Sequence, residues 1–139
     1  MMSLIAVVLV FHLAGMVMWI GGLFMALAAA KPGSADAAAR SERARLAQSG
    51  MRRMAHPGAA LMVLSGALLF YLLPEVRLAP WMHAKLGLVA VLIVLDLLLA
   101  ARVRRLPAED LSAGQMGMFH GTIGLVWALI LVLVVVKPF

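Results

Sequence analysis

Four apolar runs, each about 20 residues long or longer, divide this sequence. They cover approximately residues 4–30, 54–73, 81–101 and 116–136. About 20 residues of α-helix cross the apolar core of a bilayer, and a helix satisfies its own backbone hydrogen bonds there. Only 13% of the residues are charged, against about 25% in a soluble domain. The chain is therefore predicted to be an all-α integral membrane four-helix bundle, with residues 1–139 forming a single domain.

The basic residues predict how these helices are oriented. Nine of the twelve Lys and Arg residues lie in the first connection, residues 31–53, or in the third, residues 102–115. Cytoplasmic loops carry an excess of such residues. Both termini are therefore expected on the outer, periplasmic side of a bacterial inner membrane. Because the charges lie in short loops between apolar runs, the net charge of +6 does not indicate nucleic acid as a partner.

Local signals predict where the helices begin. The first run is longer than the apolar region of a signal peptide and follows no basic segment, which indicates a retained helix. Ser34 or Asp36 is expected to cap a short helix that leads into the second span. Pro57 would then kink that helix or start its membrane part. Ser112, followed three residues later by Gln115, is a capping-box pattern that opens the fourth helix.

Histidines are the candidate ligands of a cofactor. The chain has no Cys, which excludes thiolate metal sites and covalent haem attachment. His12 lies roughly 14 Å inside the first span and shares a helix face with Gly15 and Trp19. A neutral imidazole is the usual axial ligand of a haem iron. The alternative for His12 is an interhelical hydrogen bond with ordinary packing of small residues.

The partner of His12 stays open at this point. His120 shares a face with Trp127, much as His12 does with Trp19. His56 and His120 match in depth, whereas His12 meets His83 or Lys85 if the helices are staggered. The candidates for a metal are His12, His83 and His120, with His56 and Trp19 as further cofactor contacts.

Two charged residues of the third span are candidate catalytic groups. Placing Lys or Asp at the middle of a membrane helix costs about 2.5–3.5 kcal/mol, so such residues persist when they are paired, solvated or needed. Lys85 is expected either to extend to the membrane surface or to contact a substrate. Asp96 is expected to reach Arg102 or Arg53, or to relay protons.

Copper is a second candidate cofactor. Of the eleven methionines, Met16 and Met18 form one close pair and Met116 and Met118 another, and thioethers suit Cu(I). Most of the methionines lie inside apolar runs, where Met commonly fills the core, so copper is the less favoured interpretation. Neither Ser65 nor Ser112 is expected to have a base beside it, and no nucleophile is predicted.

Taken in order, these residues resemble the HemJ-type protoporphyrinogen IX oxidases, small four-helix membrane proteins related to the CopD-like domain. The segment Trp81–Leu86 matches the family's Trp-Leu-His-x-Lys-Leu, and residues 134–139 match its closing VVVKPF signature. The resemblance covers nearly the whole chain. Its other parts are Phe11-His12, Trp19, Gly22-Leu23, Met51-Arg52-Arg53, Pro57 and Gly66.

The chain departs from the family pattern in three places. Phe24–Leu27 stands where the family has Tyr-Leu-Pro-Arg, and Leu95-Asp96 where it has Tyr-His. His120–Ile123 stands where the family has Asn-Glu-Val-Pro. Several polar positions are thus replaced, so the resemblance carries the fold and haem binding more directly than it carries catalysis.

The resemblance implies a haem b held in the bundle and oxidation of protoporphyrinogen IX to protoporphyrin IX in haem biosynthesis. Electrons would pass to a membrane acceptor, with the quinone pool as the expected one. His12 is then the leading haem ligand, His83 and His120 are alternates for a second ligand, and Lys85 contacts substrate or transfers protons. The alternatives are a haem b electron carrier or assembly subunit without its own substrate, and a CopD-like copper-handling protein. The Gly and Ala faces are suited to a homodimer.

Overall fold

A computed structural model of the chain describes residues 2–33 and 36–137. The regular structure of these residues is helical throughout. Its elements are α1 (Met2–Ala29), α2 (Ala37–Gly50), the π-helix η1 (Met51–Ala55), α3 (His56–Leu72), α4 (Pro74–Arg77), α5 (Pro80–Arg104) and α6 (Ala113–Val136). Four helical stretches are long and apolar enough to cross a membrane: Ser3–Ala29, Ala37–Leu72, Pro80–Arg104 and Ala113–Val136. The all-α prediction with four such helices is confirmed.

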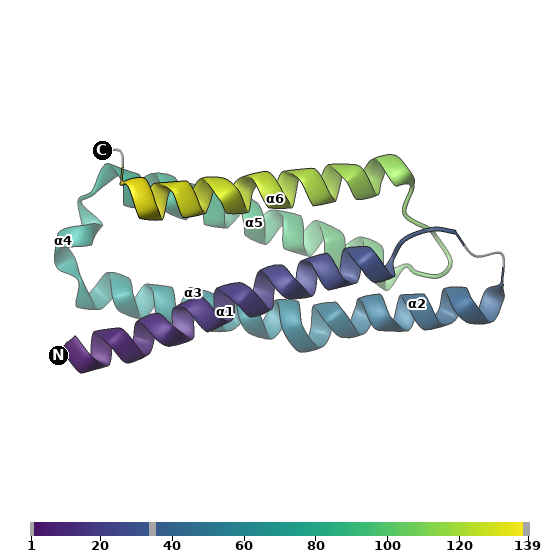
Figure 1. The fold of residues 1–139 in the computed structure, drawn as a ribbon, viewed down its shortest axis with the longest axis horizontal. Helices are drawn as coiled ribbons and strands as arrows, with labels where there is room; N and C mark the ends of the chain where they lie inside the picture. Colours follow the sequence, from purple (N-terminus) through teal and green to yellow (C-terminus); the bar gives the residue numbers. More distant parts are fainter. Residues whose placement is uncertain (1, 34–35, 138–139) are drawn as a thin grey trace.

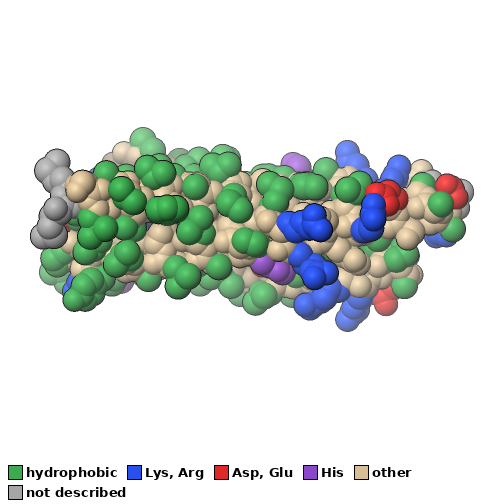
Figure 2. Space-filling model, turned by 90° about the horizontal axis from the view of Figure 1, so that it is seen from below, with side chains coloured by type: hydrophobic (Ala, Val, Ile, Leu, Met, Phe, Trp, Pro, Cys, Tyr) green, Lys and Arg blue, Asp and Glu red, His purple; other side chains and the backbone are tan. Residues whose placement is uncertain are grey.

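The long helices form two pairs. α1 packs along α3, and α5 packs along α6 (Figure 1). The start of α1, the end of α6 and α4 lie at one end of the molecule, which we name the terminal end. α2 and the connection between α5 and α6 lie at the other, the basic end, where Lys and Arg side chains gather (Figure 2). Hydrophobic side chains cover most of the remaining surface of this view.

Two of the predicted caps are confirmed. The Asp36 side chain accepts a hydrogen bond from the Ala38 backbone N–H at 3.2 Å and starts α2. The Ser112 hydroxyl accepts from the Gln115 N–H at 3.1 Å, and the Gln115 side chain accepts in return from the Ser112 N–H at 3.1 Å. This reciprocal pair satisfies two backbone donors that a helix start leaves free. Ser34, the alternative cap, lies outside the described residues.

Pro57 stands in the first turn of α3. The helix does not stop before it: α2 continues through η1 into α3, as expected of a helix that leads into the second span. Proline lacks an N–H, and its ring clashes with the carbonyl four residues earlier. The wider turn of a π-helix makes room at such a point.

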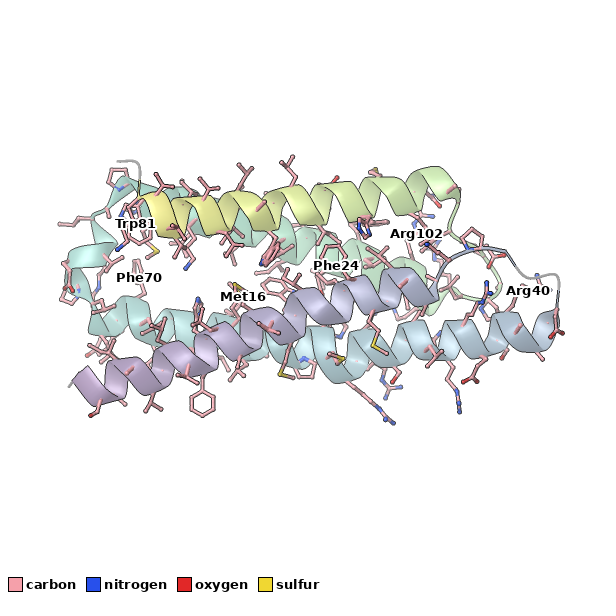
Figure 3. All side chains as sticks on the ribbon, in the orientation of Figure 1. Met16, Phe24, Arg40, Phe70, Trp81 and Arg102 are labelled. Carbon is pink, nitrogen blue, oxygen red and sulfur yellow. The ribbon has the colours of Figure 1, made fainter. Side chains whose placement is uncertain are left out.

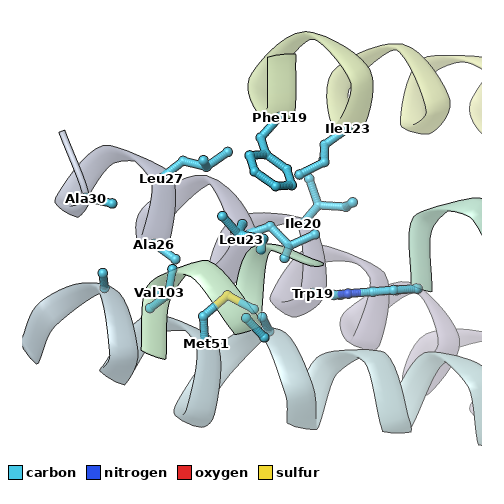
Figure 4. Packing of buried hydrophobic residues seen from close by; sticks show 14 of the residues in the cluster. Trp19, Ile20, Leu23, Ala26, Leu27, Ala30, Met51, Val103, Phe119 and Ile123 are labelled. Atoms are coloured by element: carbon cyan, nitrogen blue, oxygen red, sulfur yellow. The ribbon is translucent and has the colours of Figure 1, made fainter. Parts of the chain in front are cut away.

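The tightly packed core lies toward the basic end. Figure 4 shows Phe119 and Ile123 of α6 reaching toward Ile20 and Leu27 of α1. The largest side chains that are fully enclosed are Trp19, Leu23, Leu27, Leu92, Leu99, Val103 and Ile123. All four long helical stretches contribute to this core, since Met51 and Ala55 of η1 are also buried.

Glycines bring α1 and α3 into backbone contact. A Cβ at Gly58 would collide with the backbone of Trp19, and one at Gly22 with the backbone of Ala55. At Gly15 a Cβ would lie 2.5 Å from the Met62 nitrogen. Small residues permit such close approach of membrane helices. The α1–α3 pair is therefore close-packed along most of its length.

The two helix pairs enclose fewer side chains toward the terminal end. The first buried residue of α5 is Leu92, twelve residues after its start at Pro80, and the last of α6 is Ile130. We name residues 2–14, 63–91 and 127–137 the terminal half, and the rest of the bundle the basic half. Among the described residues of the terminal half, the buried ones are Val8, His12, Ser65 and Ile130.

Candidate functional site

Contacts between helices fix which residues lie at the same level. Trp19 of α1 bonds to Asp96 of α5, and Lys137 lies over the ring of Trp81 at 5.6 Å from its centroid. On this register Lys85 lies about one helical turn from His12 toward the terminal end, and Trp127 about half a turn toward the basic end. The three side chains therefore occupy neighbouring levels of the terminal half.

His12 is held in the seam between α1 and α3. Its Nδ1 lies 2.9 Å from the Met62 carbonyl oxygen and 3.3 Å from the Ser65 hydroxyl. A carbonyl only accepts hydrogen bonds, so Nδ1 carries the hydrogen and Nε2 carries the lone pair. A Cβ at Gly66 would lie 2.9 Å from His12 Cε1, so Gly66 makes room for the ring. The interhelical hydrogen bond offered as the alternative is present, and it leaves Nε2 available.

Ser65 is a contact of His12 that sequence reasoning missed. The sequence predicts no base beside Ser65, but the imidazole of His12 lies next to its hydroxyl. The Ser65 hydroxyl donates to the Leu61 carbonyl at 2.5 Å, and His12 Nδ1 is itself a donor. The imidazole therefore does not accept the serine proton, and this pair is not a nucleophile with its base.

Lys85 lies on the inward face of α5, the face that carries Leu92 and Asp96. Its side chain is half-buried and close enough to His12 for an electrostatic interaction. Among the described residues it has no hydrogen-bond or ion-pair partner. A cationic side chain left unpaired beside apolar surroundings is costly, which makes Lys85 a candidate for contact with a ligand.

Asp96 joins a chain of three side chains in the basic half. The Trp19 indole N–H donates to Asp96 Oδ1 at 3.1 Å, and His56 Nε2 lies 3.5 Å from Asp96 Oδ2. The expectation that Asp96 reaches Arg102 or Arg53 is wrong, since both arginines are exposed and the carboxylate has other partners. The Asp96 side chain is 6% exposed and that of His56 is 43% exposed. The chain thus runs from the core to the surface.

His83 and His120 lie away from His12. His83 is exposed, and its Nδ1 lies 3.2 Å from the Ala79 carbonyl within α5. His120 is exposed, and its ring centroid is 4.8 Å from that of Phe24. His56 lies beside Asp96 of α5, and no contact among the described residues joins it to His120. The described residues contain no group of three His, Asp or Glu side chains suited to a metal ion.

The two methionines near His12 point to different sides of α1. Figure 3 shows Met16 directed toward the space between the helix pairs, and it packs against the core. Met18 lies in the α1–α3 seam, where its Cβ is close to Gly58. Residues two apart on a helix do not face the same way. Met16 and Met18 therefore do not form one thioether site with His12.

Trp127 contributes a polar group that sequence reasoning did not single out. It lies on the face of α6 that carries the buried Ile123 and Ile130. Its Nε1 is buried. Among the described residues, it is the one buried side-chain nitrogen or oxygen atom without a hydrogen-bond partner. Buried indole N–H groups usually find an acceptor, so Trp127 marks a place where an acceptor is missing.

These observations bring His12, Lys85 and Trp127 to neighbouring levels of one half of the bundle, and Trp19, Asp96 and His56 into a chain in the other. No protein-family model, curated protein or solved structure matches this chain.

Proposed function

We propose that this protein is a haem b-binding oxidoreductase of the bacterial inner membrane that oxidises protoporphyrinogen IX to protoporphyrin IX. The observation that carries the proposal is the geometry of His12, together with the sequence resemblance at Trp19, His83 and Lys85. In this proposal the basic end faces the cytoplasm and both termini face the periplasm, as the positive-inside rule favours.

The donor set around His12 fits a haem. Ligating histidines usually donate their other ring N–H to a carbonyl or carboxylate, which fixes the tautomer and orients the ring. The 2.9 Å contact between His12 Nδ1 and the Met62 carbonyl oxygen meets this requirement. His12 would hold the iron through Nε2. His83 and His120, proposed as alternates for a second ligand, are exposed and fit less well.

The terminal half offers an apolar setting for a porphyrin. In Figure 3 the side chains of Phe70, Trp81 and Met16 lie toward the space between the α1–α3 and α5–α6 pairs. In the proposal, a flat ring would enter there from the lipid by parting the two helix pairs. A bound haem would supply one-electron redox chemistry, with electrons passing on to a membrane acceptor such as quinone.

Oxidation of a porphyrinogen releases protons as well as electrons, and the chain has groups that can take them. Lys85 lies near His12 and would accept a proton when its ammonium is deprotonated. Asp96 and His56 would pass protons toward the basic end, because the Asp96 carboxylate is enclosed and the His56 ring beside it reaches the surface. Trp19 holds the carboxylate in place through its N–H.

The test is a visible spectrum of the detergent-purified protein, oxidised and reduced, with metal analysis of the same sample. The expected result is a Soret band with sharp reduced α and β bands, lost in His12→Ala and retained in His83→Ala. Protoporphyrinogen oxidation by wild type, and its loss in Lys85→Ala, would support the activity. A colourless protein, or an unchanged spectrum in His12→Ala, would refute the haem assignment.

The electron-carrier alternative is favoured by the same His12 geometry, because that geometry concerns haem and not substrate. It predicts a haem that quinol reduces, with no turnover of porphyrinogen. The copper alternative predicts stoichiometric copper that is lost when His12, Met16 and Met18 are replaced. The opposed directions of Met16 and Met18 weigh against it.

A further inference from the structure

Two hydrogen-bond donors of the terminal half have no acceptor among the described residues. One is the buried Trp127 indole N–H. The Lys85 ammonium has no hydrogen-bond or ion-pair partner among the described residues. Both lie on inward faces, Lys85 in line with Leu92 and Asp96 on α5, and Trp127 in line with Ile123 and Ile130 on α6. Two N–H donors at neighbouring levels of the bundle are therefore left without an acceptor among the described residues.

The register of the α5–α6 pair places the two donors within reach of one ligand. Because Lys137 lies over Trp81 at the ends of these helices, Trp127 is level with residue 91 of α5. That is six residues from Lys85, roughly 9 Å along the helix axis. A lysine side chain spans much of this distance, and a bound ring with side groups spans the rest.

The missing partner is an acceptor, and the charge balance indicates an anionic one. The chain has six acidic residues. Of these, Glu75 alone belongs to the terminal half, and it is exposed in α4. Asp96 belongs to the basic half and is engaged by Trp19 and His56. No carboxylate of the described residues neutralises Lys85, so the ligand would bring the negative charge.

We propose that the terminal half binds an apolar carboxylic acid, whose carboxylate pairs with Lys85 and whose oxygen accepts from Trp127 Nε1–H. The site deepens the proposed function and rests on it only for the choice of probe, since protoporphyrin IX is an apolar molecule with carboxylate side groups. Trp127 lies nine residues before the end of α6, roughly 13 Å inside. This depth suits the acid group of an embedded ligand better than a phospholipid headgroup at the surface.

The test measures porphyrin binding to the full chain in phosphatidylcholine nanodiscs, with empty nanodiscs as the blank. The probes are protoporphyrin IX and its dimethyl ester, which has the same ring without the charges. Quenching of Trp fluorescence gives the affinities without any turnover. Wild type is expected to bind the diacid about tenfold or more tightly than the ester, because hydrogen bonds to charged groups are strong.

Lys85→Met is expected to abolish this preference, and Lys85→Arg to retain it. Trp127→Phe should weaken diacid binding by about twofold to tenfold, the effect of one hydrogen bond. The matched control is Lys137→Met, which alters a Lys at the end of the same helix pair. This variant should bind the diacid as wild type does.

Equal affinity for diacid and ester would overturn the proposal, as would equal losses in Lys85→Met and Lys137→Met. Displacement of the porphyrin by phosphatidylglycerol lipids would assign the site to a headgroup instead and would also overturn it. Diacid preference without porphyrinogen oxidation would refute the proposed function and leave the site standing. Turnover of porphyrinogen with no preference for the diacid would refute the carboxylate site and leave the proposed function standing.

Discussion

The basic and terminal halves are built from the same long helices, but they differ in whether their polar side chains have partners among the described residues. In the basic half, the Trp19 N–H donates to Asp96, and both residues are enclosed. In the terminal half, the Trp127 N–H has no acceptor and Lys85 has no counter-charge among the described residues. Leu92, Leu99 and Ile123 are fully enclosed near the first tryptophan, whereas Trp127 and Lys85 are half-buried.

This difference separates folding from binding within one small bundle. An unpaired buried donor lowers stability, so the half that holds the Trp127 N–H contributes less to the folded state than its apolar content suggests. Functional sites commonly carry such costs. We infer that the basic half and the α1–α3 seam hold the fold, and that the terminal half is completed by what it binds.

The largest expected effect comes from cavities. Leu99→Ala, in the basic half, should lower the free energy of unfolding by about 2–5 kcal/mol, because a fully enclosed side chain is lost. Leu88→Ala, on the half-buried face of α5 in the terminal half, should cost distinctly less. Thermal unfolding in one detergent compares the two variants. Equal losses would remove the distinction between the halves.

Glycine substitutions test the same contrast by adding volume. Gly58→Ala should destabilise the protein by about 1–3 kcal/mol or more, since the new methyl group meets the backbone of Trp19 and overpacking is costly. Gly87→Ala, in the terminal half of α5, meets no atom within 4 Å and should be neutral. Unfolding midpoints measured side by side give the answer. A tolerated Gly58→Ala would contradict the close contact of α1 with α3.

The two tryptophans provide a matched pair. Trp19→Phe should cost about 1–3 kcal/mol, because it leaves the enclosed Asp96 carboxylate without its donor. Trp127→Phe removes an N–H that has no partner and should leave the stability of the ligand-free protein nearly unchanged. Chemical or thermal unfolding of both variants checks this. A large loss in Trp127→Phe would mean that its N–H is already satisfied.

Lys85→Met should change stability by less than Trp19→Phe does, and with the opposite sign. Replacing an unpaired, half-buried ammonium by an apolar chain of similar length should stabilise the ligand-free protein by about 0.5–2 kcal/mol, as functional residues often oppose stability. The midpoint should therefore rise. Lys137→Met, which removes a cation lying over Trp81, is the control and should not raise it.

The sequence alone was enough to predict the order of the four long helices and two of their caps. Long apolar runs locate membrane helices because the bilayer sets their length, and the caps at Asp36 and Ser112 follow from local hydrogen bonding. The helix expected to lead into the second span does so, but the π-helix η1 that joins α2 to α3 was not predicted. A wider turn that absorbs a proline has no clear signature in residue types.

The candidate site was less predictable because it depends on contacts between helices. Arg102 was one of the two partners expected for Asp96, with Arg53, but residues six apart do not share a helix face. Counted from the basic ends of the predicted spans, Trp19 lies 11 residues deep and Asp96 five, so depth alone does not pair them. The Ser65 contact of His12 and the unpaired N–H of Trp127 depend on how neighbouring side chains pack, which the order of residues does not reveal.

The π-helix η1 makes the second long helical stretch, Ala37–Leu72, sensitive to the insertion or deletion of a residue. Each residue of an α-helix turns the chain by about 100°, and a π-turn carries an extra residue. η1 therefore sets the phase between two interfaces: Ala44, Ala47 and Gly50 of α2 are buried on one side of it, and His56 meets Asp96 on the other. Deletion of one residue within 51–55 would rotate one interface out of contact. Insertions and deletions, which loops accept readily, should be rejected by selection along this stretch.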